Sequence, residues 1–254
     1  MTDSAQPQAA VTYVGHASVA VEIAGTKILT DPVLTNRLKH LRRVGAPAAD
    51  FDPSSVDIIL ISHQHHDHFH IPSVKLLPRT AHVVVPHGMG PKLRSLRFET
   101  VTEVAVGDSI KIGPVTITAV PANHDDRRHP GVRRVTPIGF LFEADGWVGY
   151  FPGDTEIFDD MATLAPKIDL ALIPIWGWGP TLGGGHLDPQ GAADALGLLG
   201  ADTAIPIHWG TLWPYHVRPN DRLVLPPKEL ASAVEARGIE VNLIEVQPGG
   251  HTSV

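Results

Sequence analysis

Polar and apolar residues alternate along the first 30 positions of the chain. The alternation covers residues 11–14, 18–23 and 27–30, and Gly25 and Thr26 give a turn signal before the last of these segments. A period of two places successive side chains on opposite faces of a strand. The pattern therefore predicts a β-hairpin or meander that ends at Asp31 and Pro32.

An uninterrupted apolar run with several β-branched residues occupies positions 56–61, after a polar stretch that contains prolines. Such a run is typical of a strand that is buried on both faces. The positions that follow predict a strand at 82–86 between two short helices, at 72–77 and 91–96.

Turn residues divide the middle of the chain into short strand-like segments. Gly107-Asp108 and Gly113-Pro114 separate three of them, which predicts an antiparallel meander over 101–106, 109–112 and 115–120. Asp145-Gly146 is a strong hairpin signal, and it joins strands predicted at 138–143 and 147–151.

Helical and strand patterns alternate in the last 100 or so positions. We predict helices at 158–164, 189–199 and 227–237, and strands at 170–175, 203–207 and 240–244. No low-complexity linker separates this βα-alternating half from the β-rich first half. We therefore expect residues 1–254 to form a single α/β domain.

Four potential metal ligands lie within six residues, directly after the apolar run at 56–61: His63, His65, Asp67 and His68. The chain has no cysteine, so any metal must be held by imidazole and carboxylate groups. A solvated histidine-rich loop is the alternative, but the end of a buried strand is where open sheets place ligand sites. The spacing therefore predicts a site for two metal ions.

Three more polar residues, His124, Asp154 and His208, each follow a strand-like segment. Taken singly, His124 and Asp154 could be turn residues, and His208 could be a hydrogen-bonded core histidine. Taken with the cluster at 63–68, they complete a set of metal ligands.

In order and approximate spacing, this motif series resembles the signature of the metallo-β-lactamase superfamily. The segments YVGHAS at 13–18, LTDPV at 29–33, GDT at 153–155 and IPIHWGT at 205–211 resemble two of its groups more particularly. These are the ascorbate-phosphate lactonase-like group and the N-acyl-phosphatidylethanolamine phospholipase D-like group. The resemblance implies a four-layered αββα sandwich.

The resemblance also implies a ligand assignment. His63, His65 and His124 would hold one divalent ion, Asp67, His68 and His208 a second, and Asp154 would bridge the two. We expect zinc. Manganese, iron and nickel are alternatives, because histidine-rich sites accept each of these metals and the affinity order alone does not distinguish among them. A hydroxide between two ions could attack a small ester, lactone or phosphodiester.

We expect Asp67, Asp154 and His186 to be catalytic residues. His186 lies in a glycine-rich segment where it could act as an acid or as an oxyanion donor. His16 and Asp31 are second candidates, because each could orient a ligand or could instead satisfy local backbone groups.

Arginines at 127–128 and 133–134 follow His124, where they could meet an anionic or phosphorylated substrate or could form a solvated loop. A formal net charge of −7 argues against a nucleic-acid partner. A nuclease or phosphodiesterase of the same fold and a non-catalytic metal-binding protein remain as alternatives to the small-molecule hydrolase. The chain has no long apolar run and a polar start, so we expect a cytoplasmic protein, and we leave a homo-oligomer open.

Overall fold

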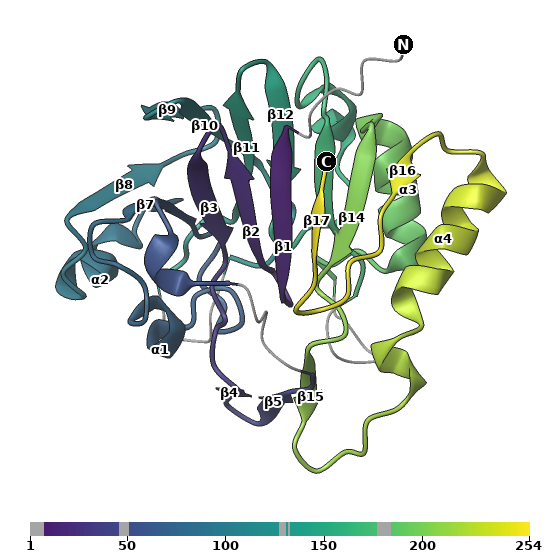
Figure 1. Cartoon of the computed structure of the whole chain (residues 1–254), viewed down its shortest axis with the longest axis horizontal. Helices are drawn as coiled ribbons and strands as arrows, with labels where there is room; N and C mark the ends of the chain where they lie inside the picture. Colours follow the sequence, from purple (N-terminus) through teal and green to yellow (C-terminus); the bar gives the residue numbers. More distant parts are fainter. Residues whose placement is uncertain (1–7, 46–50, 127–130, 132, 177–183) are drawn as a thin grey trace.

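Two large β-sheets dominate the protein (Figure 1). The structure is a computed structural model, and it describes the chain apart from residues 1–7, 46–50, 127–130, 132 and 177–183. Each sheet has an antiparallel half and a parallel half.

The first sheet carries the predicted N-terminal meander. In spatial order its strands are β17 (His251–Ser253), β1 (Ala9–Gly15), β2 (Ser18–Ile23), β3 (Thr26–Thr30), β6 (Ile58–Leu60), β7 (His82–Pro86) and β8 (Thr100–Val104). Strands β1, β2 and β3 pair antiparallel, which confirms the meander. Strand β6 lies between β3 and β7 in parallel register, and all three of its residues are buried, as the apolar run predicts.

The second sheet carries the predicted hairpin and most of the C-terminal strands. Its order is β16 (Asn242–Leu243), β14 (Thr203–Ile207), β13 (Leu170–Pro174), β12 (Trp147–Phe151), β11 (Ile138–Ala144), β10 (Val115–Pro121) and β9 (Ser109–Ile112). Asp145 and Gly146 both have positive φ values, 52° and 78°, as the two-residue turn between β11 and β12 requires.

The predicted meander over residues 101–120 is wrong in one respect. Strand β8 pairs in parallel with β7 of the first sheet, whereas β9 and β10 pair antiparallel in the second. Both β8 and β9 are edge strands, so the short connection through Gly107 passes from one sheet to the other. Turn residues predict a reversal of the chain, but they do not specify the partner of the strand that follows.

The helices cover the outer faces of the two sheets (Figure 1). They are α1 (Ile71–Val74), α2 (Gly90–Ser95), α3 (Pro189–Leu199) and α4 (Pro226–Arg237), with 3₁₀ turns at Pro53–Ser55, Asp159–Thr163 and Asp221–Leu223. The predicted helix at 158–164 is thus a 3₁₀ turn. Helix α3 begins where the Asp188 side chain accepts from Gly191 N at 2.8 Å, and it ends at the left-handed Gly200.

Two apolar clusters hold these layers together. The larger joins inward side chains of both sheets, such as Val21 and Phe140, to Leu196 of α3 and Leu230 of α4. The smaller packs the other face of the first sheet against α1 and α2. The result is a sandwich in the order helix, sheet, sheet, helix, and the shared core supports our proposal that the chain is one domain.

A third sheet, which the sequence pattern did not predict, lies at one end of the sandwich (Figure 1). It consists of β4 (Arg37–Leu38), β5 (Leu41–Arg43) and β15 (Leu212–Pro214). Its two parts come from segments that follow β3 and β14, so it joins the two halves of the chain. Within the described residues, no helix has the length and apolar character to cross a membrane.

Candidate metal centre

The loop after β6 brings the first four predicted ligands together. Ser62 anchors the start of the loop, because its backbone N–H and its hydroxyl donate to the Asp31 carboxylate at 2.7 and 2.5 Å. Phe69 N donates to His65 O at 2.7 Å, which closes a tight turn around the ligand residues. The buried strand thus ends in a loop whose entry and exit are both held by hydrogen bonds.

His63, His65 and His124 form a first group. The Nδ1 atom of His65 lies 3.0 Å from His63 Nε2 and 2.9 Å from His124 Nε2. His124 comes from the segment after β10, which belongs to the other sheet. Three imidazole nitrogens therefore converge from two sheets, within reach of a single ion.

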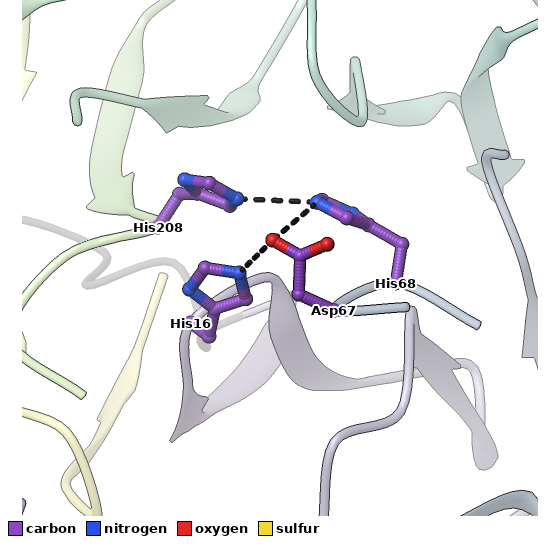
Figure 2. A group of neighbouring side chains, drawn as sticks. All are labelled: His16, Asp67, His68 and His208. Atoms are coloured by element: carbon purple, nitrogen blue, oxygen red, sulfur yellow. Dashed lines mark hydrogen bonds and ion pairs between the residues drawn. The ribbon is translucent and has the colours of Figure 1, made fainter. Parts of the chain in front are cut away.

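A second group contains Asp67, His68 and His208, which approach one another in Figure 2. His68 Nε2 lies 3.1 Å from His208 Nε2 and 3.9 Å from Asp67 Oδ2. His208 follows β14 and has a φ of 63°, an uncommon backbone conformation for a residue other than glycine.

Asp154 lies between the two groups. Its Oδ2 atom is 4.0 Å from His63 Nε2 and 3.0 Å from His68 Nε2. Its Oδ1 atom is buried, and it accepts no hydrogen bond within the described part of the chain, although His208 Nε2 lies 3.2 Å away. A buried carboxylate oxygen without a hydrogen bond is costly, and a metal ion would satisfy it.

Hydrogen bonds from the far side of each ring fix the orientation of four histidines. The Nδ1 atoms of His124 and His208 donate to the backbone oxygens of Gly185 and Trp176, both at 2.7 Å. The remaining two rings use polar side chains: Nδ1 of His68 donates to Asp31 Oδ2 at 2.6 Å, and Nδ1 of His63 lies 2.9 Å from the Ser62 hydroxyl. In the rings of His63, His124 and His208 the other nitrogen, Nε2, keeps its lone pair toward the cluster, as a metal ligand requires, and His68 would offer the same nitrogen once a metal displaces its proton.

The protonation of the cluster also suits a divalent cation. Burial lowers the pKa of His124 to about 4 and that of His208 to about 3, so these rings are neutral at pH 7. Burial acts to raise the pKa of Asp154, but the histidines around it hold it well below its usual value. His68 is the exception: burial acts to lower its pKa, and the carboxylates of Asp154, Asp67 and Asp31 raise it well above the usual value.

The structure therefore brings together all seven residues that the sequence predicts as ligands, and His186 with them. His186 Nε2 lies 3.4 Å from Asp154 Oδ2, and its side chain is 24% exposed. The second candidates lie there too: Asp31 contacts His68, and His16 contacts Asp67 at 3.1 Å. The sequence carries no signal for the backbone oxygens of Gly185 and Trp176 as partners, because any residue type can supply them.

The predicted arginines have different outcomes. Arg127 and Arg128 lie outside the described residues. Arg134 pairs with Asp126 at 3.2 Å on the surface. The guanidinium group of Arg133 packs beside Gly88, where a β-carbon on that residue would lie 3.7 Å from Arg133 Cζ. These contacts match the solvated-loop alternative as well as a substrate-facing one.

A cavity of about 200 Å³ opens beside the cluster. The turn between β4 and β5, at Lys39 and His40, forms one wall, and the loop residues His65 and Asp67 form the other. Small-molecule sites in proteins are concave and contain a few convergent polar groups, as here.

Comparisons with known proteins agree with this geometry. A family model described as the Beta-lactamase superfamily domain matches residues 26–209. The chain is 30% identical, over 247 residues, to a UPF0173 metal-dependent hydrolase of Methanopyrus kandleri, a match that covers 94% of this chain and 97% of the relative. It is 31% identical, over 254 residues, to N-acyl-phosphatidylethanolamine-hydrolyzing phospholipase D 1 of Caenorhabditis elegans, with 88% of this chain and 70% of that relative covered.

Solved structures show the same fold. Igni18, a metallo hydrolase from Ignicoccus hospitalis, superposes with a TM-score of 0.75 at 24% identity, over 97% of this chain and 98% of that chain. The likeness confirms the four-layered αββα sandwich that the motif series implies.

Proposed function

Because this chain belongs to the metallo-β-lactamase superfamily and is a metal-dependent hydrolase, we propose that it uses two metal ions to cleave a small ester, lactone or phosphodiester. One observation carries the proposal. Seven histidine and aspartate side chains from both sheets face one another with ring nitrogens about 3 Å apart, as in the His63, His65 and His124 group. His63 and His124 both use Nδ1 for a hydrogen bond on the far side of the ring, so two Nε2 lone pairs face the single Nδ1 atom of His65. One N–H of His65 cannot make a linear hydrogen bond to both, whereas a cation among the three nitrogens would bind all of them.

In this proposal His63, His65 and His124 would hold one ion, and Asp67, His68 and His208 would hold the other. Asp154 would contact both, since its Oδ2 atom lies 4.0 Å from His63 Nε2 of the first group and 3.0 Å from His68 Nε2 of the second. Bound divalent ions supply a nucleophile by lowering the pKa of water toward neutrality, and they polarise the substrate oxygen. We propose zinc as the native metal, because imidazole and carboxylate ligands suit it.

The chain's own groups would position the substrate and the attacking water. Asp67 and Asp154 would orient that water, since a carboxylate oxygen accepts a hydrogen bond from it. The substrate would enter the cavity between Lys39 and Asp67. His186 is partly exposed beside Asp154, and its ring N–H would donate to the oxygen on which negative charge develops.

The names of the relatives suggest the sequence in which substrates should be tested. The Caenorhabditis elegans relative is named for hydrolysis of N-acyl-phosphatidylethanolamine, a phosphodiester. Phosphodiesters therefore come first in a screen, followed by lactones and carboxylic esters. We place nucleic acids last, because the net charge of −7 opposes binding to a polyanion.

The first test measures metal content and activity together. Untagged protein would be analysed by elemental mass spectrometry as the wild type, as a His65→Ala, Asp154→Ala double variant and as a His216→Ala control on the exposed surface. We expect two equivalents of metal in the wild type and in the control, and loss of metal from a double variant that keeps its circular dichroism spectrum.

Activity would then be measured with bis(4-nitrophenyl) phosphate, a chromogenic lactone and 4-nitrophenyl acetate, before and after treatment with a chelator. Hydrolysis that disappears with the metal and returns on its addition supports the proposal. Folded wild-type protein that cannot be loaded with metal would overturn it. Protein that binds two equivalents but hydrolyses none of the three probes would overturn the proposed substrate classes.

A further inference from the structure

His16 occupies a place in this centre that the seven ligands do not account for. It lies in the turn between β1 and β2, and its side chain is 1% exposed. In Figure 2 its ring points at Asp67 and lies beside His208. We infer that His16 is a positioning residue, which holds Asp67 and His208 at the separation that the second metal requires. This inference rests on the proposed function.

The backbone of His16 is fixed at both ends. Its N–H donates to the Thr211 hydroxyl at 2.8 Å, and its carbonyl accepts from His208 N, also at 2.8 Å. Its φ of 59° is in the left-handed region, which residues other than glycine seldom adopt without a compensating contact. The turn between β1 and β2 alone does not explain why a histidine is buried at this position in a left-handed conformation.

The ring of His16 contacts two of the proposed ligands. Nε2 lies 3.1 Å from Asp67 Oδ2, and because a carboxylate accepts, the ring nitrogen donates. The ring centroid lies 3.8 Å from that of His208, with an angle of 34° between the planes. The hydrogen bond would fix the position of Asp67 Oδ2, the oxygen that also lies 3.9 Å from His68 Nε2, and the ring contact would limit rotation of His208.

These contacts also connect the two halves of the sandwich. Asp67 follows β6 of the first sheet, whereas His208 follows β14 of the second. His16 comes from the first sheet and makes its backbone bond to the second. It therefore determines how far apart the ligands of the two sheets lie at this end of the molecule.

His16 is not itself assigned as a ligand. Its Nε2 atom lies in one group with potential ligand atoms of Asp67, His68 and His208, but while it donates to Asp67 it has no lone pair to offer an ion. This distinction between positioning and ligation can be tested, because glutamine can donate a similar hydrogen bond but binds metals poorly.

The test compares His16→Ala, His16→Gln and the exposed control His216→Ala with the wild type. Metal-free protein would be titrated with zinc against a chromogenic chelator, and with cobalt while its visible absorption is recorded. We expect His16→Ala to bind the first equivalent as the wild type does and the second 10- to 100-fold more weakly. His16→Gln should recover most of the second affinity, and His216→Ala should match the wild type.

Binding of the first equivalent reports that each variant is folded. His16→Ala protein that binds both equivalents with wild-type affinity would overturn the inference and leave the proposed function intact. A His16→Gln variant as weak as His16→Ala would also overturn it, because the imidazole would then be needed as a ligand. Wild-type protein that binds no metal would overturn the proposed function, and the inference with it.

A double variant tests the route through Asp67. If His16 acts by holding that carboxylate, His16→Ala should lower the affinity for the second metal equivalent much less in an Asp67→Asn background than in the wild type. An effect of equal size in both backgrounds would contradict the positioning of Asp67.

Discussion

Replacement of Asp31 by asparagine should damage both the stability of the protein and its second metal site. Asp31 is fully buried, and its carboxylate accepts three hydrogen bonds, from Ser62 N, the Ser62 hydroxyl and His68 Nδ1. Asparagine has the same shape, but it replaces one acceptor oxygen by an NH₂ group. If the amide oxygen keeps the bond to Ser62 N, the NH₂ group faces two donors.

The size of the effect follows from these contacts. Two hydrogen bonds to a charged acceptor contribute about 1.5–3 kcal/mol each, so their loss would cost about 3–6 kcal/mol in the metal-free protein. Removal of a buried charge offsets part of this loss, and we expect a value near the lower limit. His68 must also turn its ring or change its tautomer, which should lower the affinity for the second metal equivalent about 10- to 100-fold.

Urea denaturation of the metal-free protein and competitive metal titration would measure the two effects. Asp52→Asn is a matched control, because the exposed Asp52 likewise accepts from the N–H and hydroxyl of one serine, Ser54, but does not contact a histidine of the cluster. The control should change neither quantity. An Asp31→Asn protein with wild-type stability and wild-type affinity for two ions would refute the role given to Asp31.

Three further outcomes are expected. His186→Ala should lower kcat about 10²- to 10⁴-fold on a substrate found in the screen and keep two metal equivalents; loss of an equivalent would make His186 a ligand instead. Gly149→Ala should destabilise the protein by about 1–3 kcal/mol in thermal unfolding, because the added carbon would overlap the buried ring of Phe142; an unchanged melting temperature would contradict this packing. Metal-free protein should melt at a lower temperature than loaded protein, since free metal at about 100 times its Kd stabilises a folded site by about 2.7 kcal/mol; equal melting temperatures would indicate that metal does not bind the native state.

The candidate site was predictable to the extent that its signals are local. His63, His65, Asp67 and His68 lie within one loop, so their spacing is visible in the sequence. His124, Asp154 and His208 were found because each follows a strand-like run. The partners of His16 and Asp31 were not predictable, since those contacts join positions 51 and 37 residues apart.

The fold shows the same division. The N-terminal meander and the hairpin at Asp145-Gly146 depend on alternation and turn residues, both of which can be read locally. The pairing of β8 with β7, and the small sheet of β4, β5 and β15, depend on long-range contacts between short strands. Segments of two or three residues, such as Arg37–Leu38, are too short to show a period.

The distribution of the proposed ligands along the chain has a consequence for how the protein matures. A ribosome that has completed the first sheet as far as β8 has made His63, His65, Asp67 and His68, but none of the ligands that the second sheet supplies. His208, after β14, is the last of the seven proposed ligands to be synthesised. A nascent chain can therefore hold an ion only through an incomplete donor set. Tight loading should begin only after His208 has left the exit tunnel and the two sheets have docked.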